Sequence, residues 1–170
     1  PASEQLSLYH PAAFGDLADI KGHWRLKRAL EVAAAGRHNM FLFGPPGSGK
    51  TMAAYRLPTI LPTLSDEQAL EVTQIHSLAG MLHKQAGLIR HVPFRTPHHS
   101  ASCEGIIGGG KIPRPGDASL AHKGILFLDE VPEFRKNVLQ GLREPIEAEK
   151  VVISRARMNV WFPATNIGKN

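Results

Sequence analysis

The fold is decided by the stretch Gly44-Pro45-Pro46-Gly47-Ser48-Gly49-Lys50-Thr51. It matches the phosphate-binding P-loop pattern, in which two glycines flank four residues and are followed by a lysine and a hydroxyl residue. Glycine lets the backbone turn tightly around phosphate oxygens because no Cβ stands in the way. Proline has no N–H, so the amide donors come from residues 47–51, which open a predicted helix. The pattern predicts that all eight residues bind a nucleotide, with Lys50 on the outer phosphates and the Thr51 hydroxyl on Mg²⁺.

The flanking residues supply the context that a P-loop requires. Residues 40–43 (Met-Phe-Leu-Phe) form a continuous apolar run, which is typical of a parallel strand buried on both faces. Residues 51–57 are good helix formers and end at Pro58. A glycine-proline turn in an ordinary loop is the alternative, and it is the weaker explanation when both flanks are present.

A second apolar run, residues 124–128, ends in the carboxylates of Asp129 and Glu130. An acid at the C-terminal tip of a strand beside the P-loop strand can hold the Mg²⁺ shell, which is the Walker B role that we predict for Asp129. Glu130 is then placed to orient and polarise a water for attack on the γ-phosphate, so we predict Glu130 and Lys50 as the catalytic residues. An ordinary acidic turn at a strand end is the alternative, and it would be preferred without the P-loop.

Length and composition restrict the class of protein. A chain of 170 residues with 42% apolar residues is long enough for one α/β domain with a sizeable core. No apolar run approaches the roughly 20 residues that span a bilayer, and the first residues lack a signal-peptide pattern. Cys103 is the single cysteine, which excludes an intramolecular disulfide and favours a reducing cytoplasm. The net charge of +5 permits nucleic-acid binding without establishing it.

Periodicity and capping signals predict the remaining elements. A helix is expected over residues 22–35, with Gly36 as its C-cap. Ser65 and Gln68 form a capping-box pattern at the start of another helix, which Gly80 ends. Its predicted apolar face consists of Leu70, Val72, Ile75 and Leu78.

The second half of the chain contains a long connection, a helix and a hairpin. Residues 88–123 are rich in proline, glycine, histidine and basic residues. A connection of this length is either functional or carries small elements of its own, and we interpret it as an insertion with loops that reach outward. Pro132 is expected in the first turn of a helix, and Pro145 is expected to kink or end it near Glu144. The buried face of this helix is predicted to hold Phe134, Val138, Leu142 and Ile146. Residues 150–162 are expected to form a β-hairpin.

The motifs together resemble those of AAA+ ATPases, and the longer stretches resemble one bacterial branch of them. The stretches that carry the resemblance are Asp19-Ile20-Lys21-Gly22, residues 57–62, Pro93-Phe94-Arg95-Thr96-Pro97-His98-His99, Gly108-Gly109-Gly110, Pro113-Arg114-Pro115-Gly116 and residues 119–124. They occur in the order typical of the magnesium-chelatase subunit I-like ATPases associated with competence, the ComM type. The resemblance covers roughly residues 12–163.

This resemblance implies a P-loop AAA+ core with a parallel sheet flanked by helices, which binds ATP and Mg²⁺ between the subunits of a hexameric ring. It implies ATP hydrolysis that drives remodelling or branch migration of DNA. It also implies that residues 88–123 contain the helix-2 insertion facing the pore, that residues 150–162 are the pre-sensor hairpin, and that Ile20 and Lys21 line the adenine pocket. The core is expected over residues 1–163.

The resemblance stops near residue 163. The family continues into a strand that carries the sensor-1 asparagine and then into a helical lid, whereas residues 164–170 do not follow that pattern. We therefore expect a truncated core, which leaves open a non-hydrolysing, nucleotide-binding fragment. A motor subunit of a magnesium chelatase that acts on a protein partner is the other alternative to DNA. A zinc site at His98, His99 and Cys103 is disfavoured because structural zinc needs four ligands.

Overall fold

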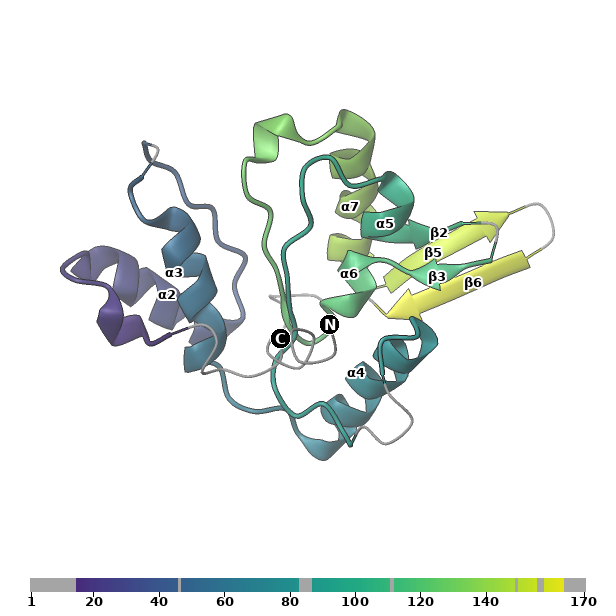
Figure 1. Ribbon diagram of the computed structural model, residues 1–170, viewed down its shortest axis with the longest axis horizontal. Helices are drawn as coiled ribbons and strands as arrows, with labels where there is room; N and C mark the ends of the chain where they lie inside the picture. Colours follow the sequence, from purple (N-terminus) through teal and green to yellow (C-terminus); the bar gives the residue numbers. More distant parts are fainter. Residues whose placement is uncertain are drawn as a thin grey trace.

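The computed structural model describes residues 15–45, 47–82, 87–110, 112–148, 150–155 and 158–163. Figure 1 shows helices α2 (Trp24–Gly36) and α3 (Lys50–Arg56) side by side at one end of the molecule and the hairpin of β5 (Lys150–Arg155) and β6 (Met158–Pro163) at the other. The 3-10 helix η2 (Leu17–Asp19) precedes α2 in the chain, and the 3-10 helix η3 (Leu57–Ile60) directly follows α3. Residues 1–14 and the predicted tail 164–170 lie outside the described part of the chain.

The cluster of Leu17, Ile20, Leu30 and Ala53 joins η2, α2 and α3 into one packed unit. Each of these side chains is at most 9% exposed. The predicted C-cap of α2 is displaced by one residue, because Gly36 is the last helical residue and Arg37 has the left-handed conformation, with φ of 50°. A left-handed residue commonly ends a helix, and arginine takes that position here although glycine would do so with less strain.

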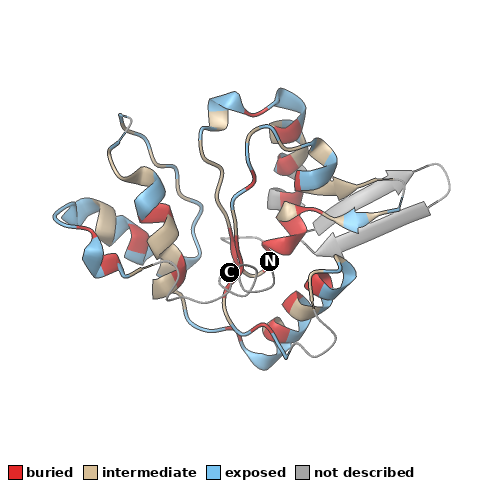
Figure 2. Cartoon of the chain, viewed as in Figure 1, coloured by how far each residue is buried: buried red, intermediate tan, exposed pale blue. Residues whose placement is uncertain are grey.

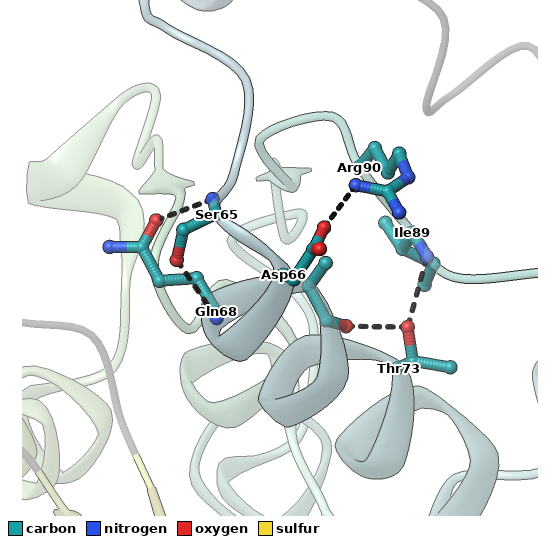
Figure 3. Close-up of polar contacts among 7 residues, drawn as sticks. Ser65, Asp66, Gln68, Thr73, Ile89 and Arg90 are labelled. Carbon is teal, nitrogen blue, oxygen red and sulfur yellow. Dashed lines mark hydrogen bonds and ion pairs between the residues drawn. The ribbon is translucent and has the colours of Figure 1, made fainter.

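Helix α4 (Asp66–Leu78) begins at the predicted capping box, which Figure 3 shows. The Gln68 backbone N–H donates to Ser65 Oγ at 3.3 Å, and the Ser65 N–H donates to Gln68 Oε1 at 3.1 Å. Further along α4, Thr73 Oγ1 donates to the carbonyl of Ala69 at 2.6 Å and accepts from the Ile89 N–H at 2.9 Å. An ion pair between Asp66 and Arg90 adds a second link from α4 to the chain that follows it.

The predicted apolar face of α4 is partly wrong. Leu70 and Leu78 are 49% and 67% exposed, whereas the buried positions of the helix are Ala69, Val72, Ile75 and His76. Both sets have helical spacing, so periodicity alone does not decide which stripe faces the core. Ala69 is small and the ring of His76 is hydrogen-bonded, so the stripe of α4 that contains them can pack closely against the core. Leu70 and Leu78 lie outside this stripe.

A short parallel pair lies at the centre of the fold. Strand β1 (Phe94–Arg95) pairs with β4 (Ile125–Leu126), with Phe94 opposite Ile125. The chain between them forms α5 (Cys103–Ile107), the antiparallel pair β2 (Gly108–Gly109) and β3 (Arg114–Pro115), and α6 (Asp117–Leu120). The long connection therefore carries small elements of its own, one of the two alternatives that its length allows. The α/β class with a parallel pair and flanking helices is confirmed.

Helix α7 (Lys136–Ala148) packs against α5, and Figure 2 shows buried residues concentrated there. The hydrophobic cluster to which α7 contributes consists of Ile106, Ala118, Phe134, Val138 and Leu142. The burial of Phe134, Val138 and Leu142 confirms three of the four positions predicted for the buried face. The fourth, Ile146, is not among the residues whose burial is described.

Of the two prolines predicted to shape this helix, one lies before it and the other lies inside it. Pro132 lies in a separate 3-10 helix, η4 (Val131–Glu133), so α7 starts only at Lys136. α7 also continues through Pro145, which therefore does not end the helix near Glu144. An interior proline costs a helix about 3 kcal/mol, and Pro145 is buried.

The hairpin predicted for residues 150–162 is present as β5 and β6. Its strands are antiparallel, with Lys150 opposite Pro163 at the open end and Arg155 opposite Met158 beside the turn. The apolar run of residues 40–43, in contrast, forms no strand, and Phe41 and Phe43 are 79% and 92% exposed. Among the described residues no segment pairs with this run, and a strand without a hydrogen-bonded neighbour is not stable.

Candidate active site

The backbone of the P-loop requires glycine at two positions. Gly47 and Gly49 have φ of 75° and 81°, a region that residues with a Cβ rarely adopt. A Cβ on Gly47 would meet no atom within 4 Å, so backbone conformation and not crowding requires glycine there. Gly49 directly precedes the first residue of α3, Lys50. Pro46, which the sequence also predicts in this site, lies outside the described residues.

The ammonium group of Lys50 points back into the loop. Lys50 Nζ donates to the carbonyl oxygens of Gly44 and Pro45, both at 2.8 Å, and lies 3.4 Å from Ser48 Oγ. These neutral oxygens accept the hydrogen bonds that the ammonium group of Lys50 could donate to phosphate oxygens. A phosphate oxygen would form a stronger, charge-assisted bond with this group. The loop therefore holds this cation in a place where an oxyanion can replace its present partners.

Thr51 and Asp129 are in direct contact although 78 positions separate them in the chain. Thr51 Oγ1 donates to Asp129 Oδ2 at 2.8 Å. Thr51 is the second residue of α3, and Asp129 comes three residues after β4 ends. The structure thus unites the two motifs that the sequence analysis assigned to one site.

The chemistry of this pair fits a magnesium ion. Mg²⁺ prefers oxygen ligands and is held in nucleotide sites by one or two protein side chains together with waters and phosphates. A hydroxyl and a carboxylate that already lie within hydrogen-bonding distance form such a set. Thr51 and Asp129 are therefore the residues that would hold the ion.

Glu130 follows Asp129 in an unusual backbone conformation. Its φ is 53°, which is uncommon for a residue other than glycine, asparagine or aspartate and is a form of strain found at functional sites. The Glu130 N–H donates to Asp129 Oδ1 at 3.0 Å, so the two oxygens of Asp129 have different partners. The carboxylate of Glu130 is 68% exposed and can receive a water molecule.

A large cavity separates the P-loop from the chain around β4. Its volume is about 1390 Å³, and residues 40–44 and Lys50 line one part while residues 122–132 line another. Nucleotide-sized ligands occupy pockets of several hundred cubic ångströms, so the space is sufficient. Lys50, Asp129 and Glu130 all line this cavity, which places the three predicted functional side chains around one space.

The two residues predicted for the adenine pocket lie elsewhere. Ile20 is 1% exposed and packs with Leu17, Leu30 and Ala53, whereas Lys21 is exposed. Neither residue lines the large cavity. Their contact with a base stays a prediction.

A buried polar group links α4 to α6. The ring of His76 is fully buried, and its Nε2 donates to the carbonyl of Leu120 at 2.9 Å. Burial, assisted by the nearby Arg95 guanidinium, outweighs this hydrogen bond and lowers the pKa of His76 to about 4.

The carboxylate of Glu71 has two basic neighbours. It lies 2.8 Å from His122 Nε2 and 3.7 Å from Lys123 Nζ. The hydrogen bond with His122 is the main reason why the pKa of Glu71 is lowered.

Sequence reasoning missed a contact between His99 and Glu130, whose Nδ1 and Oε2 atoms lie 3.7 Å apart. The available signal was topological. Residues that follow two paired parallel strands emerge at the same edge of the sheet, and His99 and Glu130 both come four residues after their strands, β1 and β4, end.

Comparison with known proteins gives concordant results. The family model of magnesium chelatase, subunit ChlI, matches residues 16–167. The chain is 53% identical over 154 residues to the protein YifB of Salmonella typhimurium, and 50% identical over 153 residues to the competence protein ComM of Haemophilus influenzae. These alignments cover 91% and 88% of this chain but 30% and 29% of the relatives, so the chain spans about a third of their length.

A solved structure supports the fold. The chain superposes with a TM-score of 0.61 and 21% identity on a structure of the complex between subunits BchI and BchD of magnesium chelatase. The match covers 84% of this chain and 50% of the other. Separately, none of the helices in the described residues is long and apolar enough to cross a membrane.

Proposed function

Because the chain belongs to the magnesium chelatase subunit ChlI family of AAA+ proteins, we propose that it binds ATP at residues 44–51 and hydrolyses it with Asp129 and Glu130. Family membership supports use of a nucleotide and Mg²⁺ in general terms. The observation that carries the proposal for this chain is the 2.8 Å contact between Thr51 Oγ1 and Asp129 Oδ2, with Lys50 beside it in the same cavity.

The residues of the site have distinct tasks in this proposal. Lys50 Nζ leaves the carbonyl oxygens of Gly44 and Pro45 and binds phosphate oxygens instead. The positive charge of the ammonium group offsets the negative charge of the phosphates. Thr51 and Asp129 hold Mg²⁺, which neutralises charge on the phosphate oxygens when bound. Glu130 orients a water toward the γ-phosphate and accepts its proton.

In the complete protein we propose that a ring of these modules, a hexamer by family resemblance, couples hydrolysis to remodelling or branch migration of DNA. The 50% identity to ComM and the net charge of +5 support DNA as the partner. The single cysteine supports a cytoplasmic location. The rival proposal is a chelatase motor that acts on a protein partner. It draws support from membership of the magnesium chelatase subunit ChlI family and from the similar fold in the complex between subunits BchI and BchD.

The test is the ATPase rate of the full-length protein without DNA and with single-stranded, duplex and branched DNA. We expect DNA to stimulate the rate and the stimulation to fall as salt rises, because phosphate contacts release counterions. Lys50→Ala should abolish ATP binding, and Glu130→Gln should retain binding while hydrolysis is lost. Unchanged affinity of Lys50→Ala would remove the phosphate role, and stimulation by a protein partner alone would favour the chelatase proposal.

A further inference from the structure

Helix α2 and its flanking residues carry most of the net charge of the chain. Residues 21–38 contain five lysine and arginine residues and one acidic residue, which gives them a net charge of +4 in a chain of net charge +5. Lys27 is half-buried, and the exposed cations are Lys21, Arg25, Arg28 and Arg37. Such a concentration of positive charge attracts polyanions.

An exposed tryptophan lies among these cations. Trp24 is the first residue of α2, and it is 71% exposed. The guanidinium carbon of Arg25 lies 5.2 Å from the centre of the Trp24 ring, within the range of a cation–π contact. Tryptophan is on average a highly buried residue, so packing within the described fold does not account for this ring. Its flat apolar surface beside a cation is instead suited to stacking on a nucleic-acid base.

The tryptophan and two arginines share one face of α2. Residues three or four positions apart are neighbours on a helix surface, so Arg28 lies next to both Trp24 and Arg25. Leu30, on the opposite side of α2, packs against Ile20 and Ala53. α2 lies at one end of the molecule (Figure 1), and the residues of the exposed face do not line the large cavity. This face is therefore separate from the proposed nucleotide site.

We propose that this face of α2 binds single-stranded nucleic acid, with Trp24 stacked on a base and Arg25 and Arg28 in contact with backbone phosphates. The inference rests on the proposed nucleic-acid partner but not on ATP hydrolysis. In a duplex the bases are stacked on one another, so the Trp24 ring reaches a base only in a single strand. An acidic protein segment would match the charges but has no general use for the exposed indole.

The nucleic acid also has to displace an internal partner. Glu31, the one acidic residue of this segment, lies 3.0 Å from Arg28, and their side chains are 49% and 72% exposed. Exposed ion pairs of this kind contribute little to stability. Arg28 can therefore exchange Glu31 for a phosphate, and Glu31→Gln should tighten binding by about twofold or more.

Binding to oligonucleotides tests the stacking of Trp24. Full-length protein without nucleotide is titrated into a fluorescent single strand of mixed sequence and into the duplex of the same sequence. We expect Trp24→Ala to weaken single-strand binding about five- to hundredfold, the range for loss of one base–aromatic stack, and duplex binding by less than about twofold. Trp24→Phe keeps an aromatic ring and should retain most of the affinity. No loss for the single strand in Trp24→Ala, an equal loss for the duplex, or an equal loss in Trp24→Phe would overturn the inference.

The salt dependence of binding tests the phosphate contacts. Each lost contact with a phosphate of a single strand reduces the slope of log affinity against log salt concentration by about 0.7. We expect this reduction in Arg28→Gln but not in Lys136→Gln, which removes the same charge from an exposed position at the start of α7. Equal slopes for the two variants would show that total charge, and not this face, governs binding.

The same titrations separate this inference from the proposed function. If the unmodified protein and the α2 variants bind the single strand equally, the role of this face is refuted and a DNA partner still stands. If the unmodified protein binds no single strand, both the inference and the DNA partner fail, whereas ATP binding at residues 44–51 is unaffected. Tighter binding of labelled polyglutamate than of the single strand would assign the face to an acidic protein segment and overturn the inference.

Discussion

Thr51 Oγ1 donates to Asp129 Oδ2 at 2.8 Å, so one hydrogen bond spans the two halves of the nucleotide site. Asp129→Asn preserves the size of the side chain and an oxygen acceptor but removes the negative charge. We expect ATP to bind this variant with little dependence on Mg²⁺, whereas the unmodified protein should bind more tightly as Mg²⁺ is added. Titration of a fluorescent ATP analogue with and without Mg²⁺ measures this difference. The same Mg²⁺ response in both proteins would argue against Asp129 as a ligand.

His76 predicts a loss of stability in acid. Its folded-state pKa of about 4 lies below the ordinary value of 6.5, so the folded protein binds fewer protons than the unfolded chain. This contribution is fully present above pH 6.5 and decreases as the pH falls toward 4, by up to about 3 kcal/mol. His76→Gln can still donate to the carbonyl of Leu120 but does not titrate, so its stability should change less over this range.

Urea unfolding at several pH values between 4 and 7 measures the effect. The exposed His38→Gln is the matched control and should follow the unmodified protein. If His76→Gln loses as much stability in acid as that control, His76 is not the group responsible.

Gly124 predicts a packing constraint at the start of β4. A Cβ on this residue would collide with the carbonyl oxygen of Pro93, a backbone atom that cannot turn aside. Gly124→Ala should therefore separate β1 from β4 and lower the free energy of unfolding by about 1–3 kcal/mol. Gly87→Ala is the control, because a Cβ there meets nothing within 4 Å. Equal melting temperatures of the two variants would contradict the close approach.

Ser65 predicts a helix-capping contribution. Its Oγ accepts from the Gln68 N–H at the start of α4, and Ser65→Ala leaves that donor without its partner. We expect a loss of about 1 kcal/mol in unfolding free energy, while Ser65→Asp should retain most of it. Chemical denaturation of Ser65→Ala and Ser65→Asp measures both stabilities. Equal losses of stability in the two variants would show that any substitution at this position destabilises the protein, and would argue against a capping contribution.

Features that depend on local chemistry could be predicted from the sequence. The P-loop pattern and the capping box at Ser65 require particular residue types at fixed spacing, so the pattern itself carries the geometry. The acidic pair at residues 129–130 was recognisable because a P-loop needs such a partner. The Thr51–Asp129 contact agrees with that interpretation, although the catalytic roles stay predictions.

Features that depend on distant pairing could not be predicted in the same way. The run of residues 40–43 has the composition of a buried strand, but strand formation also needs a neighbouring strand, and Phe43 is 92% exposed. The buried stripe of α4 was misjudged because Ala69 and His76 face the core through contacts with other segments. The His99–Glu130 contact required knowledge of how β1 pairs with β4.

The exposed aromatic rings of Phe41 and Phe43 have a practical consequence for work with a polypeptide of these 170 residues. Short apolar runs that combine high β-propensity with low charge are templates for intermolecular cross-β association. Concentrated samples should precipitate or form oligomers of undefined size, and Phe43→Lys should keep them dispersed. Light scattering against protein concentration would reveal which preparations are fit for the binding measurements above.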